Sequence, residues 1–535
     1  MIKRSSKQYL SSPGIIFFLW VFLLTFFFPP LQAQKRKKKQ KSKVEILQAD
    51  ELNIDRIRHL KRLEGHVKLK HQEVILSCDS ALVYDNSNIV EAYSNVELNQ
   101  GDTLFLYGDF IRYDGDRRKA LVTGHVRLQD QRSQLTTDRL DVDLNTNIGY
   151  YLTGGVIEDD STRIESVRGY YHSDTKDYYF KDSVHITTPQ YDILSDSMIY
   201  NTETDLTRFS GPTQIIGDSM EIYCEEGWYD RRKETFRFVR NAEIRTAERT
   251  VNGDTIYYER HKGYGRVTGH AVMVDTARKV ILTGRLAVYY TDPERTLMTG
   301  RALFRQYDEN GDTLYMHADT LRSFRDTAGN RIMTAYYGVR IYRKDLQGVC
   351  DSLAYSFADS VIRLYTAPVI WSGENQLSAD KMDLYAREGL MDHFEMSGNA
   401  MIVSRYDSIR YNQIKGKKMY GYFRKNELYR IDVKGNGESI YYPEDQGRLI
   451  GMNRSECSNI VIFVENRKIK RIKLLKSPSG TLSPPPAGFT EEQRLKGFKW
   501  LNDLRPVSPD DVFRRAERKS GKAAEGQKKS GQRPL

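Results

Sequence analysis

The sequence predicts an all-β protein, built as an elongated antiparallel jelly roll or trough with two facing sheets and about 13 units of roughly 30 residues. Three observations carry this prediction. The chain holds 35 Tyr and 21 Phe, and aromatic side chains favour strands. Apolar and polar residues alternate with a period of two over many short stretches, which indicates strands with one buried face. One motif also recurs every 28–31 residues through most of the chain.

The N-terminal segment, residues 1–33, has the layout of a secretory signal peptide. Three basic residues precede a 14-residue apolar run, and the small-residue exit Leu31-Gln32-Ala33 follows, so we expect cleavage near Ala33. An uncleaved membrane anchor is the alternative. Residues 34–44 include the basic block KRKKKQKSK and are expected to form a disordered linker.

The repeats occupy residues 45–330 in regular form and residues 331–477 in a less regular form. Each unit begins with a small residue two places before Val or Ala, as in Gly65-His66-Val67 and Gly124-His125-Val126. In the stretch KALVTGHVRLQD, apolar residues share one face of the predicted strand and polar residues share the other. A glycine inside a strand predicts a bend or a close approach of two backbones.

A second strand-like piece follows in each unit and often begins with a small residue and an aspartate, as in SDSMIY at residues 195–200. Aspartate bonds to its own backbone in turns, so these residues are expected to mark a corner between sheets. Calcium binding by the recurring carboxylates is the alternative, but no Gly-Gly-x-Gly-x-Asp repeat is present.

The pattern stops near residue 478, and residues 478–535 form the last part. SPSGTLSPPPAG reads as a Pro-rich linker. Residues 490–506 are expected to form one short helix, with Thr490 as its cap. This helix would cover an open sheet end or dock a partner. The basic, Gly- and Ser-rich C-terminal tail is expected to be disordered.

The distribution of charge argues against nucleic-acid binding. The formal net charge is +11, but residues 1–43 carry +10 and residues 478–535 carry +5, which leaves −4 on residues 44–477. A mildly acidic body is a poor partner for a phosphate backbone.

No pattern of residues supports an enzyme, a cofactor or a metal site. The sequence lacks a phosphate loop, a dinucleotide fingerprint, a nucleophile elbow and a His-Glu-x-x-His motif. His66, His125 and His270 repeat at an outward position and are expected to be surface side chains. The four cysteines are more than 100 residues apart and are expected to be free, because distant rungs seldom come within bridging distance.

The segments GHVKLKHQEVILSCDSALVY and VTGHVRLQDQRSQLTTDRLDV resemble the organic-solvent-tolerance (OstA) family. That family includes the periplasmic lipopolysaccharide-transport bridge protein LptA and a domain of its outer-membrane partner. The resemblance covers residues 45–330 well and residues 331–465 more loosely. It implies a periplasmic β-jellyroll that shields lipid acyl chains and stacks end to end with related domains, with a possible association with the inner or outer membrane.

This resemblance implies a non-enzymatic conduit for lipopolysaccharide or a related glycolipid. Its expected partners are other jellyroll-bearing envelope proteins, joined by edge-strand pairing, or further copies of this chain joined head to tail. A structural or adhesive β-repeat protein with a sealed core is one alternative, and a polysaccharide-active β-solenoid enzyme is another. The inner face expected to contact lipid comprises Val67, Leu69, Val96, Val122, Val126, Leu128, Val156 and Val184.

Overall fold

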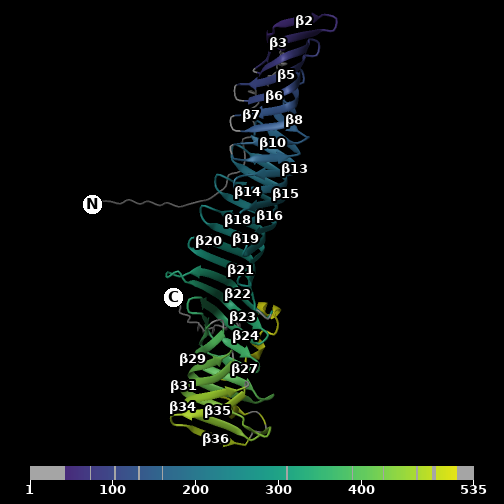
Figure 1. Ribbon diagram of the computed structural model, residues 1–535. Helices are drawn as coiled ribbons and strands as arrows, with labels where there is room; N and C mark the ends of the chain where they lie inside the picture. The colour runs from purple at the N-terminus through teal and green to yellow at the C-terminus, as the bar shows by residue number, and fades with distance from the viewer. Residues whose placement is uncertain are drawn as a thin grey trace, which may run out of the picture. The chain divides into compact units, whose positions relative to one another are not determined.

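The computed structural model describes residues 43–514, apart from gaps at 73, 102–103, 131–132, 160, 309–310, 388–389, 426, 466–467, 485–487 and 489. The predicted signal peptide, nearly all of the basic linker and the tail at 515–535 lie outside the described residues. Within them, 34 strands form one antiparallel sheet and two more form a small hairpin. The all-β prediction is therefore confirmed, and the strands stack in chain order (Figure 1).

The strands of the first half of the chain are β1 (Glu45–Gln48), β2 (Glu51–Asp55), β3 (Leu60–His71), β4 (Val74–Tyr84), β5 (Ile89–Gln100), β6 (Leu104–Asp114), β7 (Lys119–Gln129), β8 (Gln134–Asp143), β9 (Ile148–Tyr151), β10 (Gly155–Glu158), β11 (Arg163–Ser166), β12 (Arg168–His172), β13 (Asp177–Thr187), β14 (Tyr191–Asn201), β15 (Leu206–Gly217), β16 (Glu221–Asp230), β17 (Thr235–Arg245) and β18 (Arg249–Glu259).

The remaining strands are β19 (Tyr264–Asp275), β20 (Val280–Thr291), β21 (Glu294–Tyr307), β22 (Thr313–Arg325), β23 (Arg331–Arg343), β24 (Leu346–Ser356), β25 (Val361–Tyr365), β26 (Val369–Ser372), β27 (Asn375–Ser378), β28 (Lys381–Arg387), β29 (Leu390–Arg405), β30 (Tyr411–Arg424), β31 (Glu427–Tyr441), β32 (Glu444–Asp445), β33 (Arg448–Leu449), β34 (Met452–Glu465), β35 (Lys468–Leu475) and β36 (Ser479–Ser483). Three short 3-10 helices follow: η1 (Glu491–Gln493), η2 (Asn502–Leu504) and η3 (Asp510–Phe513).

The long strands bend near their middles. The pairing register shifts at this point, between Glu64 and Val67 in β3 and between Thr123 and Val126 in β7. Such shifts mark β-bulges, which bend a strand. In β7 the bulge is Gly124-His125, whose φ angles of +75° and +43° lie in the left-handed region. The bend that the recurring glycine predicted is confirmed here.

The bend divides the sheet into two legs. In β7 the first leg is Lys119–Thr123 and the second leg is Val126–Gln129. After β8 the two halves are separate strands, so that β8 pairs with both β9 and β10. The inner faces of both legs contribute to one hydrophobic core. The two facing sheets are therefore halves of one continuous sheet, and each long strand contributes to both.

A row of mostly small inward residues follows the bend from strand to strand. Cross-strand register joins Val67 to Cys78 and Ala302 to Ala318. All four cysteines lie in this row, and each is buried and free, as predicted. Burial raises the pKa of Cys78 to about 11 and those of Cys224 and Cys350 to about 12. These thiols stay protonated and act as small packing groups.

Carboxylates line the outer side of the bend and bond to the bulge of the neighbouring strand. His66 Nδ1 lies 2.7 Å from Asp50 Oδ2, and His125 Nδ1 lies 2.8 Å from Asp109 Oδ2. Asn95 donates to Asp79 in the same way, at 2.7 Å. The aspartates thus mark the corner, as predicted.

His66 should titrate above the ordinary histidine range. The hydrogen bond that the His66 imidazole donates to the Asp50 carboxylate raises the pKa of His66 above 6.5, so the charged imidazole is favoured in the folded chain. Its contribution to stability should be fully present below about pH 6.5 and should be lost as the pH rises through the folded-state pKa. NMR titration of His66 measures this shift.

The control for this titration is Asp50→Asn, which should return the pKa of His66 to about 6.5. His125 should behave in the same way, because the hydrogen bond that it donates to Asp109 raises its pKa. A His66 pKa that is unchanged by Asp50→Asn would contradict the assigned hydrogen bond.

The C-terminal segment is extended where one short helix was expected. Between Thr490 and Arg505 the structure has only the 3-10 helices η1 and η2, each three residues long. Residues 490–514, which we call the strap, pack on the outer face of the second leg. Backbone groups of this segment bond to side chains of the sheet, and these bonds replace the repeating bonds of a helix.

Two glutamines of the sheet hold the strap. The Gln413 amide donates to the carbonyl of Gln493 at 2.7 Å and accepts from the amide of Leu495 at 2.8 Å. Gln376 bonds in the same way to Lys499 and Leu501, at 2.8 and 2.7 Å. Each glutamine side-chain amide thus donates one hydrogen bond and accepts another, as the backbone of a neighbouring strand would. Leu495 completes a second, smaller core with Met401, Val403, Ile440, Tyr442 and Met452.

Candidate functional site: the apolar inner face

The inner face of the bent sheet is a continuous apolar surface. Six of the eight residues predicted to line it are at most 2 % exposed: Val67, Leu69, Val96, Val122, Val126 and Val184. Leu128 is half-buried against the same core. Alternation within each strand places these side chains inward, while their chain neighbours point to solvent.

Val156 lies on the opposite face from the one expected. Gly155 pairs with Thr137, which also pairs with Val126, so Gly155 occupies the inward row. Gly155 and Ile157 are buried and Val156 between them is only half-buried. The chain crosses the bend through a three-residue break between β9 and β10, and this break shifts the alternation by one residue.

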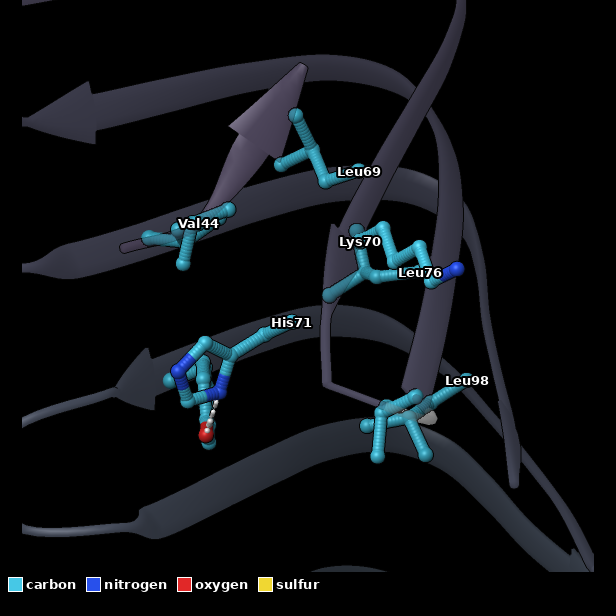
Figure 2. A pocket seen from close by; sticks show the side chains of 9 residues that line it. Val44, Leu69, Lys70, His71, Leu76 and Leu98 are labelled. Atoms are coloured by element: carbon cyan, nitrogen blue, oxygen red, sulfur yellow. Dashed lines mark hydrogen bonds between the residues drawn. The ribbon is translucent and has the colours of Figure 1, made fainter. Parts of the chain in front are cut away.

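The two legs close on each other at the N-terminal end. The cavity between them measures about 20 Å³, which is enough for roughly one water molecule. It is lined from both legs by residues that include Leu69, Leu76, Leu98 and Tyr113, and Figure 2 shows the first three among the side chains that line it. An acyl chain would enter here only if the legs moved apart.

Polar side chains link the free edges of the legs at this end. Nδ1 of His71, in the second leg, lies 2.6 Å from the hydroxyl of Tyr113, in the first leg (Figure 2). Arg118, in the turn after β6, donates to Gln72, in the turn after β3, at 3.4 Å. These two contacts join opposite edges of the sheet and so hold the N-terminal end shut.

Tyrosines continue along the inner edge of the first leg. Burial raises the pKa of Tyr113, Tyr171, Tyr229 and Tyr289, and it raises that of Tyr200 to about 12. The hydroxyl groups therefore stay neutral at ordinary pH. A tyrosine packs its ring on apolar groups and keeps its hydroxyl toward water, so this edge forms an amphipathic rim to the apolar interior.

The interior is more open in the middle of the sheet. Four inward residues of the second leg form one cross-strand row in β17–β20 and are only half-buried: Ile244, Val251, Met273 and Leu282. On the opposite leg, Phe236 and Tyr258 are also half-buried, with ring centroids 5.4 Å apart. We call this stretch the open segment.

The residues that the sequence predicted for the inner face do not include the open segment. Its members follow the same inward alternation as Leu69 and Val126, so the repeat could have placed them on the inner face. Their partial exposure depends on the distance between the legs, which no local pattern reports.

The described residues hold neither a candidate metal site nor a helix that could span a membrane. None of their His, Cys, Asp and Glu side chains gather in threes or more in a way that could hold a metal ion. No helix in this part of the chain is long and apolar enough to cross a membrane.

Parts of the chain are similar to one protein family and to solved structures. The family described as OstA-like protein matches residues 41–196, which confirms the resemblance for that part of the chain. Among solved structures, a match is the crystal structure of LptH, described as the LptA-homologous periplasmic component of the lipopolysaccharide transport device from Pseudomonas aeruginosa. It has 14 % identity and a TM-score of 0.19, and covers 20 % of this chain and 80 % of LptH. No curated protein matches the chain.

Proposed function

We propose that this chain, whose residues 41–196 match the OstA-like protein family, is a non-enzymatic carrier that shields lipid acyl chains on its apolar inner face. The observation that carries the proposal is the continuous inner face, with half-buried apolar residues in the open segment. Lipopolysaccharide or a related glycolipid is the proposed cargo.

The energetics of lipid transfer favour a covered path. Exposing an acyl chain of about a dozen methylenes to water costs roughly 10 kcal/mol, at about 0.8 kcal/mol per methylene. Such a lipid cannot cross an aqueous compartment alone at a useful rate. An apolar groove that runs from strand to strand lowers this cost at every step.

The ends of the sheet support assembly with other sheets. At the N-terminal end β1 and β2 pair only with β3, and at the other end β35 and β36 pair only with β34 among the described strands. Unpaired edges accept strands of another chain. The proposed partners are jellyroll-bearing envelope proteins or further copies of this chain, and the proposed location is the periplasm.

A photo-crosslinker placed at Met273 tests the proposal directly. Met273 points inward and its chain neighbour Val272 points outward, yet both are half-buried, so Val272 is the matched control. In cells, the probe at Met273 should capture glycolipid and the probe at Val272 should not. Mass spectrometry of extracted lipid identifies the cargo.

A sealed structural repeat is the second candidate, favoured by the small cavity at the N-terminal end. It predicts no lipid adduct at Met273 and no lipid bound to the purified protein. Equal labelling at Met273 and Val272 would also contradict the carrier function. A second probe pair, Val67 with His66, reports whether the closed end opens to lipid as well.

A further inference from the structure

The outer face of the first leg carries a straight row of aromatic and basic side chains. Nine neighbouring strands each contribute one residue in direct cross-strand register. This outer row consists of Tyr150, Tyr170, Tyr179, Ile199, Arg208, Trp228, Arg237, Tyr257 and Arg266. Arginine and aromatic residues alternate over its last five positions.

The three arginines recur with the period of the repeat. Arg208, Arg237 and Arg266 are 29 residues apart and lie on every second strand, so their backbones are roughly 10 Å apart. All three are exposed. In the described part of the chain, none of them has an ion pair, a hydrogen bond or a ring contact, whereas many other arginines bond to carboxylates.

The nearest carboxylates do not neutralise these arginines. Glu226, Asp230 and Glu259 flank the row on the same face, but each is already bonded to another cation. Arg240 bonds Glu226, Lys233 bonds Asp230 at 2.9 Å, and Lys262 bonds Glu259 at 2.6 Å. The row therefore presents three unpaired positive charges, with aromatic rings between them.

We propose that the outer row binds an anionic glycan, a saccharide chain that carries carboxylate or phosphate groups at intervals. The guanidinium fork bonds carboxylate and phosphate in a bidentate way. Trp228 and Tyr257 offer amphipathic surfaces between the charges, and their rings are held edge to face with centroids 6.5 Å apart. This site lies on the outside of the sheet and does not depend on the lipid path.

The surroundings favour a glycan over a single-stranded nucleic acid. A nucleic acid carries a charge on every residue, and its phosphates would meet Glu226, Asp230 and Glu259 beside the row. A glycan with spaced charges places neutral rings there, whose hydroxyl groups can donate to these carboxylates. The edge-to-face rings also provide no flat platform for successive bases.

Binding to immobilised hyaluronate oligosaccharide tests the site, because this glycan carries a carboxylate on every second ring. The full chain should bind it in low salt and should not bind neutral chito-oligosaccharide. The triple variant Arg208→Gln, Arg237→Gln, Arg266→Gln should weaken binding by about tenfold or more. A triple Arg→Lys variant at these positions should retain part of the affinity, since it keeps the charge but loses the fork.

The matched control removes three other exposed arginines: Arg58, Arg117 and Arg387, whose side chains are 80, 81 and 77 % exposed. Arg→Gln changes there should leave binding within about twofold. Equal losses of affinity in the two triple Arg→Gln variants would show that only the net charge matters, and this would overturn the proposed site. Tighter binding of oligo(dT) than of hyaluronate, lost with the same three arginines, would overturn the glycan assignment in favour of a nucleic acid.

Discussion

A chain in which Gln376 and Gln413 are both replaced with alanine should release its C-terminal strap. The change removes four hydrogen bonds to strap backbone groups and leaves those groups without partners in a largely buried contact. At about 1 kcal/mol per bond, with a further penalty for unsatisfied groups, the docking free energy should fall by roughly 4 kcal/mol or more. Trypsin should then cut after Lys496 and Lys499 at least about tenfold faster.

The matched control for this variant is Gln129→Ala with Gln306→Ala. Both glutamines are exposed and lie in strands of the same sheet, so their loss should leave the proteolysis rate unchanged. Fluorescence gives an independent measure, because Trp371 is fully buried beside Gln376 in the sheet and should become exposed when the strap leaves. Unchanged cleavage and emission in the double variant would show that other contacts hold the strap.

Phe238→Ala should destabilise the middle of the sheet by about 3 to 5 kcal/mol, as expected for a large-to-small change in a packed core. Phe238 is 2 % exposed and stacks on Phe236 at 4.7 Å. Its ring also occupies the space in front of Gly227, where a Cβ would lie 2.9 Å from Phe238 Cδ1. The loss should be local, because each strand packs mainly on its neighbours.

Hydrogen exchange measures this local loss. Amides of β16–β18 should exchange faster in Phe238→Ala, while those of β3–β8 should keep their rates. Adding Gly227→Val should not restore the lost stability, because a Cβ at this position would still lie 2.8 Å from the backbone carbonyl oxygen of Arg237. Arg237→Ala, an exposed neighbour, should have little effect, and uniform acceleration along the whole sheet would contradict nearest-neighbour packing.

Much of the inner face could be predicted from the repeat. Val67, Val96 and Val126 follow the alternation, and each is at most 1 % exposed. Val156 does not face inward as expected, because the bulge is replaced there by a break between β9 and β10. A pattern aligned on Gly-x-Val has no means of detecting such a change of phase.

The exposure of the open segment and the conformation of the strap could not be predicted from the repeat. Leu69 and Leu282 occupy equivalent inward positions, yet the first is 2 % exposed and the second is half-buried. The strap was expected to be helical, whereas its backbone groups bond to sheet side chains that include Gln376, Gln413 and Arg340. These partners lie at least 80 residues away in the chain.

The sequence by itself determined the strands, their inner and outer faces and the place of the bend, because alternation and left-handed glycine are local properties of the backbone. Only the tertiary structure decided how far apart the two legs stand, which edges meet and what the C-terminal segment covers. These depend on contacts between residues distant in sequence, such as His71 with Tyr113. The outer row also depends on the tertiary structure. The 29-residue spacing of its arginines can be read from the repeat, but their alignment on one face results from the register of the paired strands.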